Sequence, residues 1–274
     1  MRGASLRPRG WIQRRLGGRN VGGSTTIIES DHEVARFAAL EAGQALLAFR
    51  SDVGFESPRD LRDGGDRLAH ELITSLLAEQ RPGDAVLSEE GKDDQQRLTA
   101  TRVWIVDPLD GTREFGEDGR TDWAVHVALI ESGQPIAAAV SLPARDMVMT
   151  TFPAPAIPHR APGRLRIVVS RSHTPPEAHA IADELDAELV FMGSAGAKTM
   201  AVVLGEADAY VHLGGQYEWD SAAPVGVALA AGLRATRADG SQLLYNRASP
   251  WLPDQVVCRA DLHARVIAAL RRAA

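Results

Sequence analysis

A single stretch, residues 103–115, constrains the fold of this chain more than any other. It opens with a β-branched apolar run at 103–106, which has the length and character of a buried strand. Pro108 then removes a ladder donor, so we expect the strand to end near Asp107 and a turn to follow at Asp110. Turns at strand ends are where α/β-type scaffolds present catalytic groups, because the strand is rigid and the turn opens to a cleft. The pattern D-x-x-D-G-T therefore indicates either an ordinary surface turn or a pair of functional carboxylates.

The composition fits one large globular domain or two closely joined lobes, because 45% of the 274 residues are hydrophobic and 24% are charged. No apolar run approaches the ~20 residues of a membrane span, and a single cysteine, Cys258, excludes a disulfide within the chain, so we expect a cytoplasmic protein. Six arginines and no acidic residues lie in positions 1–25, so the rest of the chain is more acidic than the net charge of −6 indicates. Such a body is a poor general binder of nucleic acid but suits a protein that gathers carboxylates around metal ions.

Two lobes are expected behind a basic extension. Residues 1–28 are rich in Arg and Gly and lack apolar periodicity, which predicts disorder. Residues 29–274 then form a single catalytic domain, with an N-lobe at about 29–155 and a C-lobe at about 160–274. The sequence predicts helices at 30–49, from about 66 to 77, and at 176–185, 193–204, 222–231 and 261–271, and strands at 85–87, 103–106, 123–130, 135–142, 147–152, 165–169, 189–192 and 209–212.

Acidic residues recur singly at predicted strand ends and helix starts. Glu89 follows the strand at 85–87, Asp66 lies at the start of the second predicted helix, and Asp220 precedes the helix at 222–231. Surface turns and helix capping are the simpler explanations of such acids. Carboxylates gathered without compensation would repel one another, whereas Mg²⁺ prefers oxygen ligands, and two such ions can support phosphoryl transfer.

The motifs narrow the chemistry further. Two residues, not one, separate Asp107 from Asp110, which excludes the D-x-D pattern of phosphatases with an aspartyl nucleophile. No His/Cys metal spacing, G-x-S-x-G elbow or Walker loop is present. The segments WIVDPLDGT at 104–112 and WDSAAP at 219–224 resemble the two signatures of the inositol monophosphatase superfamily, and Ser-Glu-Glu at 88–90 resembles its Gly-Glu-Glu turn. The match runs in the family's order from about residue 31 to the C-terminus, and it implies a lithium-sensitive, magnesium-dependent phosphomonoesterase.

This resemblance implies an α+β fold, a layered α-β-α-β-α sandwich, with two or three Mg²⁺ ions. Glu89, Asp107 and the Leu109 carbonyl would hold the first ion. Asp107, Asp110 and Asp220 would hold the second, and a looser third ion would involve Glu89.

The resemblance also implies the residues that act on water. Thr112, oriented by Asp66, would position the attacking water and help to deprotonate it, so that no covalent intermediate forms. The run at 63–66 reads Asp-Gly-Gly-Asp, which departs from the family's usual Thr-x-Ala-Asp before the helix acid.

Three stretches bear on the substrate. VVSRSH at 168–173 and GSAGAK at 193–198 are similar to the two segments with which the CysQ type of 3'(2'),5'-bisphosphate nucleotidase contacts its nucleotide. Free N–H groups at the second segment's helix start would suit a second phosphate. Leu213 stands where inositol-specific members place a glutamate, so the partner of the inositol hydroxyls is missing. The implied substrate contacts are Gly111, Thr112, Ser170, His173, Ser194, Lys198 and Asp220, although His173 could be an ordinary turn histidine and Lys198 a solvated helix-face cation.

The function indicated is hydrolysis of 3'-phosphoadenosine 5'-phosphate to AMP and phosphate, which clears a by-product of sulfate activation. The alternatives are inositol monophosphatase or fructose-1,6-bisphosphatase activity of the same site, and a protein- or RNA-binding role of the arginine-rich arm. We expect a small-molecule phosphate ester, a nucleotide bisphosphate, as the partner, with no membrane and no nucleic acid. The sequence leaves a monomer and a homodimer open.

Overall fold

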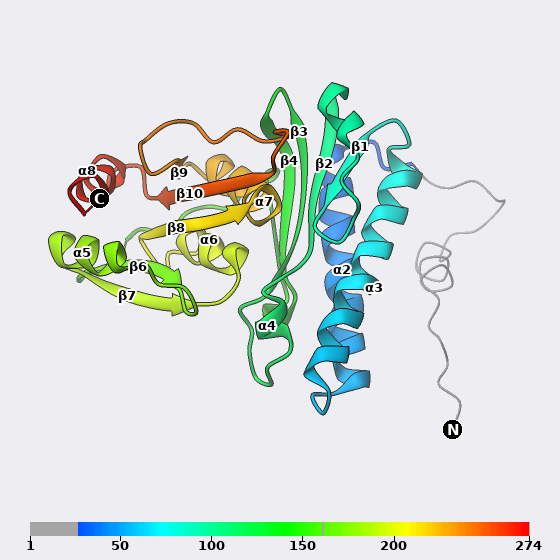
Figure 1. Ribbon diagram of the computed structural model, residues 1–274, viewed down its shortest axis with the longest axis horizontal. Helices are drawn as coiled ribbons and strands as arrows, with labels where there is room; N and C mark the ends of the chain where they lie inside the picture. Colours follow the sequence, from blue (N-terminus) through cyan, green and yellow to red (C-terminus); the bar gives the residue numbers. More distant parts are fainter. Residues whose placement is uncertain (1–26, 161, 274) are drawn as a thin grey trace.

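The computed structural model describes residues 27–160 and 162–273, so all but the last two residues of the predicted basic extension lie outside the described residues. The described elements stack in five layers, helices alternating with two sheets (Figure 1). The predicted α-β-α-β-α sandwich is thus confirmed.

The first two layers are a helical pair and sheet A. Helices α2 (Asp31–Val53) and α3 (Pro58–Gln80) cover one face of this sheet, and the other face packs mainly against α7 (Glu218–Ala230). Strand β1 runs parallel to β2, and the remaining neighbours are antiparallel. In spatial order, sheet A consists of β1 (Ala85–Ser88), β2 (Arg102–Asp110), β3 (Ala124–Glu131), β4 (Gln134–Leu142) and β5 (Met147–Thr150).

Sheet B forms the fourth layer. Helices α6 (Ala195–Val203) and α7 separate it from sheet A, while α5 (Pro176–Leu185) and α8 (His263–Ala273) cover its outer face, where Cys258 is buried. Strand β6 runs parallel to β7 and β8, and β10 is antiparallel to β8 and β9. In spatial order, sheet B consists of β7 (Ala187–Met192), β6 (Leu165–Ser170), β8 (Ala209–Tyr217), β10 (Trp251–Cys258) and β9 (Arg234–Thr236).

Three of the predicted boundaries that differ from the structure concern the site. Helix α7 begins at Glu218 and so includes Asp220, which the sequence placed before a helix at 222–231. Helix α3 begins at Pro58, so Asp66 lies well inside the helix and not at its first turn. Strand β2 does not end near Asp107 but continues to Asp110, with a shift in its pairing to β3 between these two residues. Such a shift lets a strand pass a residue such as Pro108 that cannot donate to the ladder.

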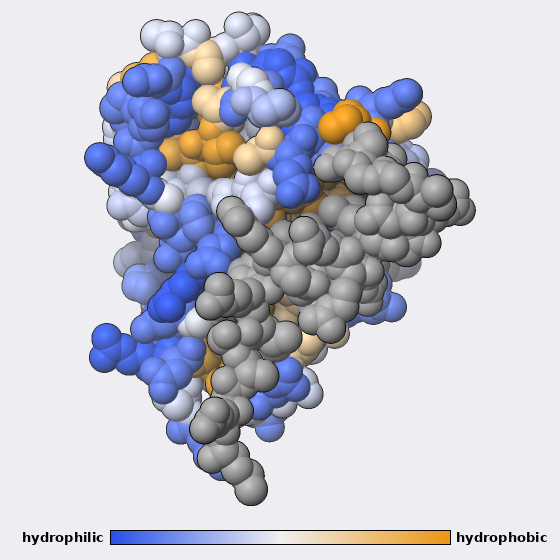
Figure 2. Space-filling view, turned by 90° about the vertical axis from the view of Figure 1, so that its right-hand side faces the viewer, coloured by the Kyte–Doolittle hydropathy of each residue, from blue (hydrophilic) through white to orange (hydrophobic). Residues whose placement is uncertain are grey.

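The outer surface of α2 and α3 is mainly hydrophilic where it is visible (Figure 2), as expected for helices that bury only one face. Among the described residues, no helix combines the length and the apolar character needed to cross a membrane.

Candidate active site

Three carboxylates meet where β2 of sheet A faces the start of α7. Asp107 and Asp110 come from the two sides of the pairing shift in β2, and Asp220 lies in the first turn of α7. One oxygen from each carboxylate lies within 4.8 Å of the other two. Asp107 and Asp110 are almost fully buried, whereas Asp220 is half-buried. The predicted convergence of distant acidic residues is therefore present in the structure.

Glu89 lies beside this group because β1 pairs parallel to β2. The Glu89 N–H donates to the Val106 carbonyl at 3.2 Å, which extends the ladder by one residue past the end of β1. Its carboxyl is hydrogen-bonded to that of Asp107. The Glu89 side chain remains exposed, so it stands at the mouth of the cluster.

The electrostatics of these carboxylates are unfavourable without a counter-charge. Burial and then the charges of Glu89 and Asp110 raise the pKa of Asp107 well above its usual value. Although the Glu89 residue as a whole is exposed, desolvation of its carboxyl group beside Asp107, reinforced by the negative charge of Asp220, raises its pKa to about 7. Burial together with the charge of Asp110 raises the pKa of Asp220 to about 6. Protons or cations must therefore compensate the cluster, and its hard oxygen donors match the preference of Mg²⁺.

Asp110 is the exception, because the chain itself compensates its charge. Burial acts to raise its pKa, but the nearby His126, Lys198 and Ser194 lower it to about 2. The His126 Nε2 atom lies 3.1 Å from Asp110 Oδ2. Ser194 Oγ and the N–H groups of Ala195, at 3.0 Å, and Gly196, at 2.6 Å, also donate to this carboxylate. The expectation of free N–H groups at this helix start is therefore wrong: Asp110 occupies them.

Thr112 and Asp66 form a second polar pair at the edge of the cluster. Thr112 Oγ1 donates to the Leu109 carbonyl at 3.0 Å and also lies within hydrogen-bonding reach of Asp66. Burial, with the charges of Glu90 and Glu89, raises the pKa of Asp66 to about 8. The structure thus brings Asp66 to Thr112 from the middle of α3, although the sequence placed it at a helix start.

The two segments predicted to contact the substrate, at 168–173 and 193–198, differ in how accessible their side chains are to solvent. Ser170 is half-buried at the end of β6 and its hydroxyl accepts the N–H of His173, whose side chain is exposed. Lys198, in contrast, is buried, and its Nζ donates to the carbonyls of Gly193 at 3.0 Å and Ser194 at 2.8 Å. The alternative of a solvated helix-face cation at Lys198 is wrong.

Gly111 and Leu213, two further positions named in the sequence analysis, have the following surroundings in the structure. Gly111 has φ +84°, and a Cβ there would lie 3.1 Å from Ser194 Cβ and 3.2 Å from the Asp122 carbonyl, so a side chain would separate the turn from α6. Leu213 packs against the apolar core between sheet B and its outer helices. It offers no polar partner for a sugar hydroxyl.

Sequence reasoning missed His126 and Asp122. His126 is fully buried in β3, where it is the register partner of Asp107, and its Nδ1 donates to the Trp219 carbonyl at 3.0 Å. Asp122 accepts the Gly193 N–H at 2.6 Å and so holds the start of α6 against sheet A. A polar residue inside the apolar run at 124–130 was the signal for His126.

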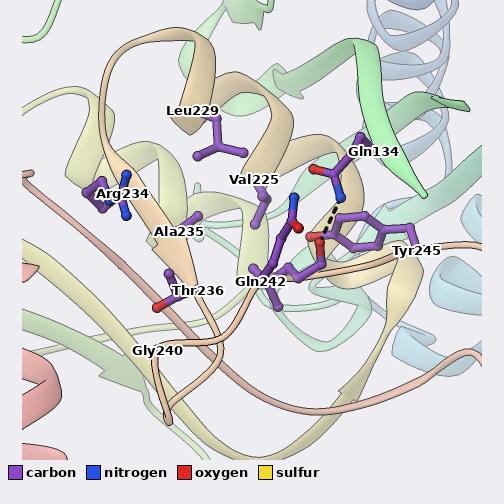
Figure 3. A pocket seen from close by; sticks show the side chains of 10 residues that line it. Gln134, Val225, Leu229, Arg234, Ala235, Thr236, Gly240, Gln242 and Tyr245 are labelled. Carbon is purple, nitrogen blue, oxygen red and sulfur yellow. Dashed lines mark hydrogen bonds between the residues drawn. The ribbon is translucent and has the colours of Figure 1, made fainter. Parts of the chain in front are cut away.

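A pocket elsewhere on the chain has a different character (Figure 3). It has a cavity volume of about 310 Å³ and lies between α7, β9 and the segment at 240–245, where Gln134 Nε2 donates to the Leu243 carbonyl at 3.1 Å. Its ten lining residues include no carboxylate, so it does not share the chemistry of the acidic cluster.

Known proteins resemble this chain along nearly its whole length. The model of the inositol monophosphatase family matches residues 25–155 and 159–274. A 3'-phosphoadenosine 5'-phosphate phosphatase from Mycobacterium leprae (strain TN) is 52% identical over 254 residues, covering 88% of this chain and 94% of that protein. The 3'(2'),5'-bisphosphate nucleotidase CysQ from Escherichia coli (strain K12) is 31% identical over 223 residues, covering 76% and 90%. The crystal structure of CysQ from Bacteroides thetaiotaomicron, a bacterial member of the inositol monophosphatase family, superposes with a TM-score of 0.70 at 29% identity, covering 85% of this chain and 98% of that one.

Proposed function

The chain belongs to the inositol monophosphatase family, and we propose that it is a magnesium-dependent phosphomonoesterase that hydrolyses 3'-phosphoadenosine 5'-phosphate to AMP and phosphate. The observation that carries this proposal is the 52% identity, along 94% of its length, to a phosphatase named for that substrate. The convergence of Asp107, Asp110 and Asp220 supplies the chemistry that such a reaction needs.

The acidic cluster is the proposed metal site. Glu89, Asp107 and the Leu109 carbonyl hold one Mg²⁺, Asp107, Asp110 and Asp220 hold a second, and Glu89 contributes to a looser third. The raised pKa values of Asp107, Glu89 and Asp220 support this assignment, because these carboxylates favour a neighbouring positive charge. When bound, magnesium offsets their repulsion and stabilises the charge that develops on the phosphoryl group.

Thr112 and Asp66 are the proposed catalytic pair. Because Thr112 donates its hydroxyl proton to the Leu109 carbonyl, its oxygen lone pairs are free to accept a hydrogen bond from the attacking water. Asp66 lies beside that hydroxyl, and its pKa of about 8 makes it far more basic than an ordinary aspartate. Thr112 would therefore orient the water, and the ionised form of the Asp66 carboxylate would accept its proton.

The nucleotide contacts we propose lie mainly on the β6 segment. Ser170 ends strand β6 of sheet B, and His173 follows it with an exposed side chain. Gly111 and Thr112 are the proposed contacts to the phosphate group of the substrate. Lys198 and Ser194 are bound to backbone carbonyls and to Asp110, so we expect them to act on the substrate through Asp110.

The proposal is tested by comparing kcat/KM for 3'-phosphoadenosine 5'-phosphate, inositol 1-phosphate and fructose 1,6-bisphosphate at saturating Mg²⁺. We expect the nucleotide to lead by at least about tenfold, because Leu213 gives inositol no polar partner. A lead of that size for either sugar phosphate would instead assign the same site to an inositol or fructose bisphosphatase.

Four remaining expectations are part of the proposal. We propose a cytoplasmic enzyme inhibited by lithium, and a homodimer is the arrangement to test by light scattering. A binding role of the arginine-rich arm is tested by deleting residues 1–26. If the chain acts purely as an enzyme, the truncated version keeps full turnover.

A further inference from the structure

Aromatic side chains gather at the edge of sheet B that faces the acidic cluster. Tyr217 ends β8, and Trp251 begins β10 directly opposite it in the register. The Tyr217 ring stacks on that of Trp219, with centroids 4.7 Å apart and planes 11° apart. Trp251 meets the Tyr217 ring edge-on at 5.4 Å. Although large, the Tyr217 and Trp251 side chains are 43% and 49% exposed.

The position of Trp251 is fixed by the backbone around it. Gly215 has φ +86°, and a Cβ at this position would lie 1.8 Å from Trp251 Cζ2. The Trp251 indole therefore occupies the space that a side chain at position 215 would need. The Pro250 carbonyl accepts the Glu218 N–H at 2.8 Å. The buried Glu218 carboxylate in turn accepts the N–H of Asn246 at 2.6 Å. An exposed ring that is held in this way loses little conformational freedom when a ligand covers it.

The aromatic pair is joined directly to the proposed metal site. The Tyr217 N–H donates to Asp220 Oδ2 at 2.7 Å. Strand β8 is also the parallel neighbour of β6, with Val168 opposite Tyr210, so β8 continues past the end of β6 at Ser170 to reach Tyr217. Because Tyr217 comes three residues before Asp220 and its backbone contacts the Asp220 carboxylate, an ester bound at Asp220 would lie close to this end of β8.

From this placement we propose that Tyr217 and Trp251 form the stacking surface for the purine base of the substrate. The inference deepens the proposed function and rests on it. Aromatic rings stack on a base through large planar faces and bind any base that reaches them. A groove of about 450 Å³ beside Trp251 also carries the exposed Arg247, whose charge suits a nucleotide with a second phosphate.

The test compares a substrate that has a base with one that lacks it. We would measure kcat/KM for 3'-phosphoadenosine 5'-phosphate and for glycerol 2-phosphate in the Mg²⁺-loaded enzyme. Trp251→Ala and Tyr217→Ala should each lower the ratio of the two values by about tenfold, through KM for the nucleotide. Trp251→Phe, which keeps a ring, should restore most of the ratio. Phe191→Ala removes an equally exposed aromatic residue of sheet B, two strands from β8, and should leave the ratio unchanged.

A binding readout keeps the proposal falsifiable if an alanine variant folds poorly. AMP should quench the tryptophan fluorescence of the wild-type enzyme, and Trp251→Phe should remove most of that quenching. The proposal is overturned if the ratio in the Tyr217→Ala/Trp251→Ala double variant stays within twofold of wild type, or if Trp251→Phe quenches as wild type does. Failure of the proposed function is seen separately, as a preference of the wild-type enzyme for the substrate without a base.

Discussion

Replacing Asp220 by Asn should stabilise the metal-free protein and at the same time abolish its response to magnesium. In the folded chain, burial and the charge of Asp110 raise the pKa of Asp220 to about 6, against 3.8 for an ordinary aspartate. Below pH 4 the group is protonated whether the chain is folded or unfolded, so it does not affect stability. As the pH rises from about 4 to 6, the unfolded chain loses this proton first, and the stability of the folded chain falls.

The difference between the two pKa values corresponds to about 3 kcal/mol above pH 6. This is an upper value, because protonation of Glu89 relieves part of the same repulsion. Asn keeps an oxygen for the Tyr217 N–H but loses the charge at the start of α7, which costs ~0.3–1 kcal/mol. The expected net gain is about 2 kcal/mol, or roughly 4–8 °C in Tm for a domain of this size.

The assay is thermal unfolding of both proteins at pH 4 and pH 8, with EDTA or with Mg²⁺. At pH 8 with EDTA the variant should unfold at the higher temperature, and at pH 4 the two should coincide. Magnesium at a hundred times its Kd should stabilise the wild type by about 2.7 kcal/mol and the variant far less. Asp254→Asn is the matched control with the opposite sign, because Arg237 lowers the pKa of Asp254 despite its partial burial. A variant that is less stable than wild type in EDTA at pH 8 would refute this account of the cluster.

Three further outcomes are expected. Asp107→Asn should lower kcat by at least about a hundredfold, while circular dichroism shows an unchanged fold; normal turnover would contradict the metal assignment. Thr112→Val should cost at least about a hundredfold in kcat, and Thr112→Ser should retain most activity; equal losses in a single-turnover assay would exclude the hydroxyl as the essential group. His126→Gln should raise the Mg²⁺ concentration for half-maximal activity by about tenfold, because it removes the ring nitrogen that orients the Asp110 carboxylate; an unchanged magnesium titration would show that this contact does not position Asp110 for the metal.

The sequence predicted the layers, most strand positions and the convergence of the acids, because these depend on local pattern and on motifs. It could not predict where α3 begins, since Gly64 and Gly65 look like a turn and yet lie inside the helix. A Cβ at Gly64 would lie 2.5 Å from the Phe49 ring, and one at Gly65 would lie 2.8 Å from that of Phe115. Both glycines therefore serve close packing against residues far away in the chain, which no local pattern reveals.

The start of α6 was misread for a related reason. Gly-Ser-Ala-Gly does predict a helix start with N–H groups directed at an anion, and that part is correct. The anion, however, is the carboxylate of Asp110, which lies 86 residues from Gly196 in the chain. Whether a helix start is open to a ligand depends on tertiary neighbours. The sequence did not reveal His126 and Asp122 for the same reason. The register of β2 and β3 places His126 opposite Asp107, and the approach of α6 brings the Gly193 N–H to Asp122.

The difference between Asp110, whose charge the chain compensates, and the other carboxylates explains how the cluster can be both preformed and dependent on metal. Asp110 is fixed as an anion by His126 Nε2, by the hydroxyl of Ser194 and by two N–H groups of α6, so its carboxylate keeps one orientation at neutral pH. His126 Nδ1 lies 3.9 Å from Asp107 Oδ2, and His126 and Lys198 act to lower the pKa of Asp220. Burial and the neighbouring carboxylates outweigh this support, so the pKa values of both Asp107 and Asp220 remain raised. A divalent ion would therefore bind beside one carboxylate, Asp110, that is already ionised and fixed in orientation. It would also favour ionisation of the other two, Asp107 and Asp220. That arrangement couples binding to deprotonation, so metal affinity should rise with pH between about 6 and 8 and release protons as it does. Calorimetric titrations with Mg²⁺ in buffers of different ionisation enthalpy would measure that release, and zero proton release at pH 6 would show that the carboxylates are already ionised without the metal.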